Sequence, residues 1–359
     1  MKRIRDFSII PGTLMPGTYN ALTDVQGVRV GHMTLIQGDT VRTGVTAIVP
    51  AADPFVYKIP AAVTTINGYG KAIGFEQIRE LGVIETPIVL TNTLSAARAA
   101  DAVIGHMIAH YPALRSVNPV VGETNDGYLN DIRQRVITAE HVTAAIRGAT
   151  DGPVAEGCVG AGMGTACYQF KGGIGTASRI VPTQHAPFTV GALVQTNFGL
   201  RHELHILGVP VGANLPHVMP GPLEDAPAGS IVVILATDAP LTSRQLERLA
   251  RRAVFGIART GTIGHGGSGD FVIAFSTAQT RAHSRYQTTQ PLHWVVDESP
   301  VLDGLFHGVV ESVEEAIYNA LTAAQTVTGR KGYTLHALPH ATLHELLSQY
   351  GRITRDEAS

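Results

Sequence analysis

A glycine followed by a serine, where a proline-rich stretch meets an apolar run, is the feature of this sequence best suited to chemistry. Residues 216–229 contain four prolines, and Ile231–Ala236 is uninterrupted apolar sequence. Attack of the Ser230 hydroxyl on the Gly229 carbonyl would cut the chain and leave Ser230 with a free α-amine. That amine, with an ordinary pKa of about 7.7–8.0, is a suitable general base for its own hydroxyl. The pair therefore suggests an N-terminal nucleophile hydrolase, although a Gly-Ser turn that only opens a strand has the same sequence.

The elements that would position this serine are short apolar runs and amphipathic segments. We expect strands at Val45–Val49, Pro87–Leu90, Pro119–Val121, Thr189–Gln195, Ile231–Thr237 and Phe271–Phe275. We expect helices from Thr93 or Ser95 to His110, from Thr242 or Ser243 to Arg259, over Val309–Val327 with Glu311, Glu314 and Glu315 on its polar face, and over Ala341–Tyr350. Residues 216–229 are predicted to form a loop. Because no regular βαβ period appears, the pattern favours a layered α/β sandwich over a doubly wound sheet.

The composition excludes several classes of partner. The 359 residues include 27 Lys and Arg against 29 Asp and Glu, so no basic surface is predicted for nucleic acid or an anionic membrane. No run of 18 apolar residues is present, and Pro11 and Gly12 interrupt the segment that a signal peptide needs. We therefore expect a cytoplasmic protein. Only 16% of residues are charged and 44% are hydrophobic, which indicates that other subunits cover part of the surface.

Familiar cofactor and metal motifs are incomplete in this sequence. The glycines of residues 160–164 do not complete G-x-G-x-x-G, because Thr165, Ala166 and Cys167 follow them. His106 and His110 have the spacing of a helical metal pair but lack a third ligand with matching spacing. Two cysteines exclude a disulfide framework and a cysteine-rich zinc site. We expect neither a metal nor an organic cofactor.

Ordered blocks along nearly the whole chain carry a resemblance to a known family. The blocks are Asn20–His32, Arg42–Ile48, Asn67–Gly70, Thr91–Thr93, Gly122–Asp131, Phe170–Arg179, Val190–Asn197, Gly229–Val233, Ala236–Leu241, Ser268–Asp270 and Glu314–Leu321. The chain resembles the L-aminopeptidase/D-Ala-esterase-amidase family together with the β-peptidyl aminopeptidases. The resemblance implies one catalytic domain over residues 1–359, cut before Ser230 into an α chain of residues 1–229 and a β chain of residues 230–359. It also implies a four-layer αββα sandwich, akin to N-terminal nucleophile hydrolases but differently connected.

The resemblance also implies roles for individual residues. Ser230 matches the family nucleophile, and Asn197 matches an asparagine whose side-chain amide helps to form the oxyanion hole. Ser268 and Asp270 match the hydroxyl and carboxylate that orient the amine of the nucleophile. Glu123 matches the carboxylate that holds the free ammonium group of the substrate. Two further residues, Tyr128 and Asn67, are candidates for lining the substrate pocket.

The function that the resemblance implies is that of a self-processing serine aminopeptidase or amidase. Its substrates would be small peptides, amides or esters with a free N-terminal amine, hydrolysed through an acyl-enzyme on Ser230. It would act as a homo-oligomer of αβ units, with a tetramer as the expected form. Two alternatives remain at this point: a related hydrolase that cuts internally in amide oligomers, and an unprocessed, non-enzymatic binding or scaffold protein. Preference among L-α-, D-α- and β-amino acids does not follow from the sequence.

Overall fold

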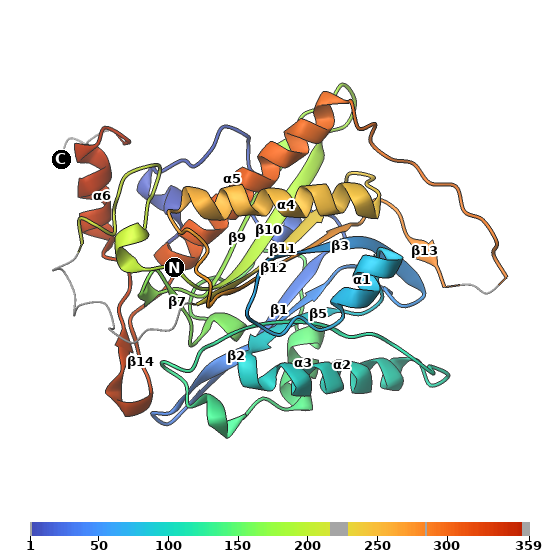
Figure 1. Cartoon of the computed structure of the whole chain (residues 1–359), viewed down its shortest axis with the longest axis horizontal. Helices are drawn as coiled ribbons and strands as arrows, with labels where there is room; N and C mark the ends of the chain where they lie inside the picture. Colours follow the sequence, from blue (N-terminus) through green and yellow to red (C-terminus); the bar gives the residue numbers. More distant parts are fainter. Residues whose placement is uncertain (1, 216–228, 284–285, 354–359) are drawn as a thin grey trace.

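Two β-sheets stacked face to face between two layers of helices form the fold (Figure 1). The computed structural model describes residues 2–215, 229–283 and 286–353. The smaller sheet has four strands in the order β1-β2-β5-β6. These strands are β1 (Arg29–Gln37), β2 (Val41–Val49), β5 (Ile88–Asn92) and β6 (Val120–Thr124).

The larger sheet carries Ser230 on a strand in its middle. Its order is β13-β3-β12-β11-β10-β9, and β4 pairs with β3 beside this path. Strand β11 runs antiparallel to β10 and parallel to β12. The strands of this sheet are β3 (Tyr57–Gly68), β4 (Val83–Ile84), β9 (Ile174–Val181), β10 (Phe188–Asn197), β11 (Ser230–Thr237), β12 (Gly269–Ser276) and β13 (Arg281–Ala282).

Helices cover the outer faces of both sheets. Helices α2 (Ala96–His110) and α3 (Ala139–Arg147) pack on the four-stranded sheet, and α4 (Ser243–Arg259) and α5 (Pro300–Thr322) pack on the larger one (Figure 1). The remaining elements are α1 (Phe75–Leu81), α6 (His340–Gln349) and two small hairpins, β7 (Ala166–Cys167) with β8 (Phe170–Lys171) and β14 (Val327–Thr328) with β15 (Thr334–Leu335). Among the described residues, no helix is both long enough and apolar enough to cross a membrane.

Alternation of side chains along β11 divides the core into layers. Val232 and Ile234 lie in the cluster between the two sheets, whereas Ile231 and Val233 lie in the cluster beneath α4 and α5. Because successive side chains of a strand point to opposite faces, Ser230 lies on the same face as Val232. The serine hydroxyl is therefore directed toward the space between the sheets.

Most of the elements expected from the sequence are confirmed. Each predicted strand overlaps an observed one, and Thr242 caps α4 by accepting a hydrogen bond from the Gln245 amide. The layered sandwich is confirmed as well. Apart from Gly229, the predicted loop over residues 216–229 lies outside the described residues. Strands β1, β3 and β9 do not follow from the sequence patterns. Glycine, threonine, serine and arginine occupy buried positions of β9, few positions of β1 are buried, and Pro60 interrupts the buried apolar stretch of β3.

The prediction for the helix over Val309–Val327 is wrong at both ends. Helix α5 begins at Pro300, where Ser299 accepts a hydrogen bond from the Val301 amide, and it ends at Thr322. The expected polar face is also wrong, since Glu311, Glu314 and Glu315 are all buried. Periodicity cannot reveal this arrangement, because the cations that neutralise these carboxylates come from distant parts of the chain.

A buried ionic cluster joins the N-terminal segment, β9 and α5. The fully buried Arg179 lies 2.9 Å from a carboxylate oxygen of Glu311 and 2.6 Å from one of Glu315. Arg5 contacts the second oxygen of Glu315 at 2.7 Å. Burial disfavours ionisation of Glu315, but the hydrogen bond of Arg5 and the charge of Arg179 outweigh it and lower the pKa of this carboxyl. Burial also opposes ionisation of Glu311, but hydrogen bonds from the Thr13 amide and from Arg179 lower its pKa, so both glutamates remain charged inside the protein.

Removing the central cation of this cluster should be strongly destabilising. Arg179→Met keeps much of the side-chain volume but leaves two buried carboxylates without their shared partner, which should cost about 3–5 kcal/mol of unfolding free energy. Denaturant unfolding measures the loss. The matched control is Arg251→Met, which removes an exposed pair with Glu247 and should cost less than about 1 kcal/mol. Equal losses in the two variants would contradict a stabilising role for the buried cluster.

Candidate active site

Ser230 is the first residue of β11 and is almost completely buried. Its Oγ accepts a hydrogen bond of 3.1 Å from the Gly269 amide at the start of β12. Across the antiparallel pair, Ser230 lies directly opposite Asn197, the last residue of β10. Directly opposed residues share one face of a sheet, with Cβ atoms about 4.5–5.5 Å apart. The pairing of β10 with β11 therefore sets the two side chains next to each other.

The peptide bond before Ser230 is tightly enclosed. A Cβ atom on Gly229 would lie 1.4 Å from the backbone oxygen of Asn197, so only glycine fits at this position. The Gly229 carbonyl oxygen accepts a hydrogen bond from the Ser268 hydroxyl. The structure thus holds this carbonyl with a side-chain donor immediately beside the serine.

Ser268 and Asp270 form a pair on the other side of the Gly229–Ser230 bond. The Ser268 hydroxyl lies 2.6 Å from Oδ1 of Asp270, which also accepts a hydrogen bond of 3.2 Å from the Ile231 amide. Burial raises the pKa of the Asp270 carboxyl, although these two hydrogen bonds oppose the shift. Asn67 steadies the same turn, because its amide nitrogen donates to the carbonyls of His265 and Ser268 at 2.8 and 2.6 Å.

The side chain of Asn197 has a defined orientation. Its Oδ1 accepts a hydrogen bond of 3.0 Å from the backbone amide of Ala166. Since a backbone N–H only donates, the atom facing it must be the oxygen of Asn197. The amino group of the same side chain is then the end available as a donor on the Ser230 face of the sheet.

Glu123 lies at the end of β6 and is also buried. One of its oxygens accepts a 2.8 Å hydrogen bond from the Lys71 amide, and the other accepts one from the Thr93 hydroxyl. The described ion pairs do not include this carboxylate. A Cβ on Gly70 would lie 3.2 Å from a Glu123 oxygen and 3.4 Å from Cα of Gly269, which places Glu123 close to the turn that binds Ser230.

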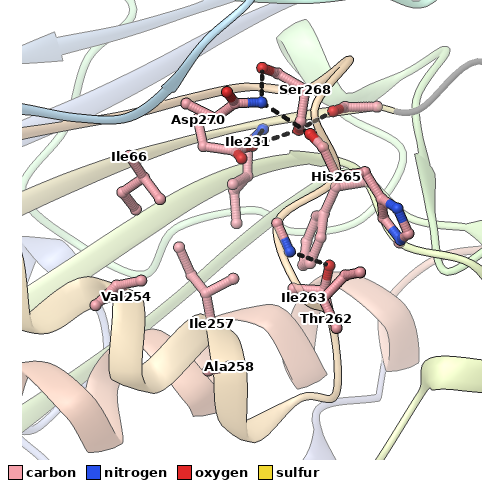
Figure 2. A pocket seen from close by; sticks show the side chains of 15 residues that line it. Ile66, Ile231, Val254, Ile257, Ala258, Thr262, Ile263, His265, Ser268 and Asp270 are labelled. Atoms are coloured by element: carbon pink, nitrogen blue, oxygen red, sulfur yellow. Dashed lines mark hydrogen bonds between the residues drawn. The ribbon is translucent and has the colours of Figure 1, made fainter.

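A pocket of about 260 Å³ opens on the α4 side of the same strand ends. Figure 2 shows Val254 and Ile257 of α4 on the opposite side of it from Ser268 and Asp270. His265 lies at its edge, with Nε2 2.8 Å from a carboxylate oxygen of Glu203. The lining residues are Ile66, Asn67, Phe198, Gly199, Gly229, Ile231, Val254, Ile257, Ala258, Thr262, Ile263, Gly264, His265, Ser268 and Asp270.

The structure brings together most of the residues singled out in the sequence. Six of them surround the peptide bond between Gly229 and Ser230: these two residues themselves, Asn197, Ser268, Asp270 and Asn67. Glu123 lies close to the neighbouring turn at Gly269. Tyr128 is placed differently, since its ring stacks on that of Tyr333 with centroids 4.9 Å apart. Its part in substrate binding stays a prediction.

Sequence reasoning missed the groups that orient the site. Thr93 belongs to the block Thr91–Thr93, but nothing in the sequence alone shows that its hydroxyl reaches Glu123. The Ala166 amide that orients Asn197 and the Glu203–His265 pair are also revealed only by the fold.

Solved structures identify the class of fold. The L-aminopeptidase/D-Ala-esterase/amidase of Ochrobactrum anthropi matches with a TM-score of 0.91 at 40% identity, over 99% of this chain and 100% of that one. That enzyme is described as a prototype of the serine aminopeptidases with a variant of the N-terminal nucleophile hydrolase fold. A β-aminopeptidase of Burkholderia sp. matches with a TM-score of 0.91 at 43% identity, over 98% of this chain and 99% of that one. This variant of the N-terminal nucleophile fold, an αββα sandwich, is the fold of the present chain.

Sequence comparison identifies the family. Peptidase family S58 matches residues 20–335. The β-peptidyl aminopeptidase BapA of Sphingosinicella microcystinivorans is 40% identical over 378 residues, covering 98% of this chain and 93% of that protein. The chain belongs to peptidase family S58 and is a hydrolase of the aminopeptidase class, as the blocks in its sequence implied.

Proposed function

We propose that this aminopeptidase cuts its own chain between Gly229 and Ser230 and then uses Ser230 as its nucleophile. The products would be an α chain of residues 1–229 and a β chain of residues 230–359, which together form one catalytic domain. The observation that carries this proposal is the hydrogen bond from Ser268 to the Gly229 carbonyl, made directly beside the serine hydroxyl. An enzyme that cleaves this bond needs its carbonyl polarised in this way.

The contacts of Ser268 support a role for its hydroxyl as the hydrogen-bond donor to the Gly229 carbonyl during cleavage. Its hydroxyl has one proton but lies within hydrogen-bonding distance of two acceptors, the Gly229 carbonyl and Asp270. Both contacts are satisfied when Asp270 is protonated and donates to Ser268, which in turn donates to Gly229. The raised pKa of Asp270 favours this protonation state. Ser268 would then stabilise the negative charge that develops on the carbonyl oxygen as Ser230 Oγ attacks. The Gly229–Ser230 C–N bond would break as the Ser230 nitrogen takes up the hydroxyl proton, and water would then hydrolyse the ester left between Gly229 and Oγ.

During turnover, the new α-amine of Ser230 would serve as the base for its hydroxyl. The amine takes the hydroxyl proton as Oγ attacks the substrate carbonyl, and it returns this proton to the departing nitrogen. Asn197 would donate its free amide N–H to the oxyanion, because its oxygen is already bound by Ala166. Water then releases the acyl group from Ser230, and no further group is needed for this sequence of steps.

Glu123 is the proposed partner of the substrate ammonium. A buried carboxylate is costly unless a cation accompanies it, and two neutral donors supply its described hydrogen bonds. A substrate with a free N-terminal amine would complete its coordination. The relatives are named for activity on β-peptides and on L-amino-acid and D-alanyl derivatives, which supports peptides, amides and esters of this type as substrates. Asn67 and Tyr128 are proposed as neighbours of the bound substrate.

The assembly and cellular location belong to the same proposal. We propose a homo-oligomer of αβ units, with a tetramer as the expected form. Large apolar side chains are exposed on the surface of the single chain, where a second copy could cover them. Trp294 is 57% exposed and Val296 is 59% exposed. We also propose a cytoplasmic location, in keeping with the sequence. Neither nucleic acid nor a membrane is expected as a partner, given the net charge of −2.

Self-cleavage should depend on the Ser230 hydroxyl. Wild-type protein should separate into two chains under denaturing conditions, with masses that match residues 1–229 and 230–359. Ser230→Ala should remain one full-length chain, because it lacks the attacking oxygen. Ser230→Thr is the control, since it keeps a hydroxyl on Cβ and should still yield cleaved chain. Cleavage of Ser230→Ala at the same bond and rate as wild type would eliminate the serine as the attacking group.

Glu123→Gln should separate turnover from self-cleavage. The glutamine keeps size and hydrogen bonding but removes the negative charge, so kcat/KM on amino-acid p-nitroanilides should fall about 100-fold. Self-cleavage should continue, because the internal peptide has no ammonium group. The control Glu85→Gln alters another buried glutamate, paired with Lys58, and should retain activity. Two results would point instead to cleavage without ammonium recognition. One is an unchanged kcat/KM in Glu123→Gln, and the other is wild-type hydrolysis of N-acetylated substrates as fast as that of the free amines.

Asn197→Ala should lower kcat far more than it changes KM. Loss of one fixed oxyanion donor typically reduces kcat by about 10²–10³, because the hydrogen bond strengthens in the transition state. Self-cleavage should also slow, since it passes through a similar tetrahedral intermediate. Steady-state kinetics on the fully cleaved variant, confirmed by mass, provide the measurement. A kcat within about threefold of wild type would show that Asn197 is not the oxyanion donor and that backbone amides supply this hydrogen bond.

A further inference from the structure

We propose that the pocket between α4 and the Ser268–Asp270 pair receives the leaving-group side of the substrate, and that it selects uncharged, apolar amine components. This inference rests on the proposed function, because it takes Ser230 as the nucleophile and its α-amine as the proton carrier. It assigns a role to the pocket that includes Gly229, Ser268 and Asp270 in its wall.

The two faces of the larger sheet separate the two ends of a substrate. The Ser230 and Asn197 side chains share the face that looks toward the four-stranded sheet, where Glu123 also lies near Gly269. The pocket lies on the opposite face, because Ile231 lines it and belongs to the core beneath α4. A substrate whose ammonium group binds Glu123 therefore has its acyl residue on the first face. The leaving group of the substrate then faces the α4 side of the sheet, where the pocket lies.

Proton transfer places the leaving nitrogen beside the pocket. When Ser230 Oγ forms its bond to the acyl carbon, the scissile C–N bond breaks and the nitrogen must gain the proton held by the Ser230 amine. That amine is the atom joined to Gly229 before cleavage, and Gly229 is part of the pocket wall. The departing nitrogen must come within about 3 Å of the amine. Its substituent then lies at the pocket mouth beside Ser268 and Asp270.

The lining defines which substituent fits. The apolar members of the wall are Ile66, Phe198, Ile231, Val254, Ile257, Ala258 and Ile263. Among the described residues, the lining contains neither lysine nor arginine, and the imidazole of His265 already contacts the Glu203 carboxylate. A negatively charged substituent would therefore find no cationic partner in the described lining. A cavity of about 150 Å³ accommodates benzene, so 260 Å³ has room for an aliphatic or aromatic side chain.

Three substrates with the same acyl residue test this selectivity. The acyl residue X is the amino acid whose p-nitroanilide the cleaved enzyme hydrolyses fastest, and the substrates are X-Leu-NH2, X-Gly-NH2 and X-Asp-NH2. We expect kcat/KM to be at least tenfold higher for the leucine than for the glycine compound, and lowest for the aspartate compound. Equal values for leucine and glycine would overturn the pocket assignment but leave the proposed function intact. Hydrolysis of none of the compounds, the p-nitroanilides included, would overturn both.

A substitution that fills the pocket provides the second test. Ala258 lies on α4 in the pocket wall, so Ala258→Phe should reduce the leucine-to-glycine ratio of kcat/KM to below about threefold. Arg251→Phe is the matched control, because it adds the same ring to an exposed position of the same helix and should preserve the ratio. A ratio that persists in Ala258→Phe would exclude this pocket as the leucine site.

Capture of the acyl-enzyme tests the same pocket in wild-type protein, independently of how any variant folds. With X-p-nitroanilide as the acyl donor, added leucinamide should divert at least five times more acyl group into X-Leu-NH2 than equimolar glycinamide diverts into X-Gly-NH2. The reason is that an acceptor amine must occupy the position of the leaving group. Equal capture of the two amines would overturn the assignment.

Discussion

The pairing of β10 with β11 is the constraint on which the site depends. It places Asn197 opposite Ser230, and it brings the backbone so close at Gly229 that no side chain fits there. A shift of the register by one residue would turn every side chain of β11 to the other face and move Ser230 away from its partner. The close approach at Gly229 opposes such a shift, because either chain neighbour would bring a Cβ against the backbone oxygen of Asn197.

The surroundings of this pair show how buried polar groups are managed in the protein. Gln195, two residues before Asn197, donates to the Thr91 carbonyl and to the Thr124 hydroxyl, and so connects the larger sheet to the strands that carry Glu123. Lys171 is fully buried, and its ammonium group donates to the carbonyls of Gly162, Thr165 and Gly172 at 2.7–2.9 Å. Burial lowers the pKa of this lysine. The three carbonyl contacts satisfy its hydrogen-bond donors, so we assign it a structural role.

Much of the fold is predictable because many of its sequence patterns depend only on neighbouring residues. Apolar runs such as Ile231–Thr237 and a capping threonine such as Thr242 act locally, so their sequence is sufficient. Strand β9 does not follow from the sequence because its buried positions include threonine, serine and arginine, whose partners lie far away in the sequence. In β3, Pro60 within the buried stretch argues against a central strand. The burial of Glu311 and Glu315 depends on Arg179 in the same way. Residue types at the site followed from family resemblance, whereas the orienting contacts of Ala166 and Thr93 required the three-dimensional structure.

The ionic cluster around Arg179 would affect how the protein reassembles if it is cut at the proposed point. Arg5 and Arg179 lie before the proposed cleavage point, and Glu311 and Glu315 lie after it. Strands from the two sides also alternate in one sheet, since β3 and β10 flank β12 and β11. Cleavage at the proposed point would leave the two polypeptides joined by noncovalent contacts alone, and refolding after denaturation would change from a unimolecular to a bimolecular reaction. The rate of recovery of the cut enzyme would then depend on protein concentration, whereas that of the intact precursor would not.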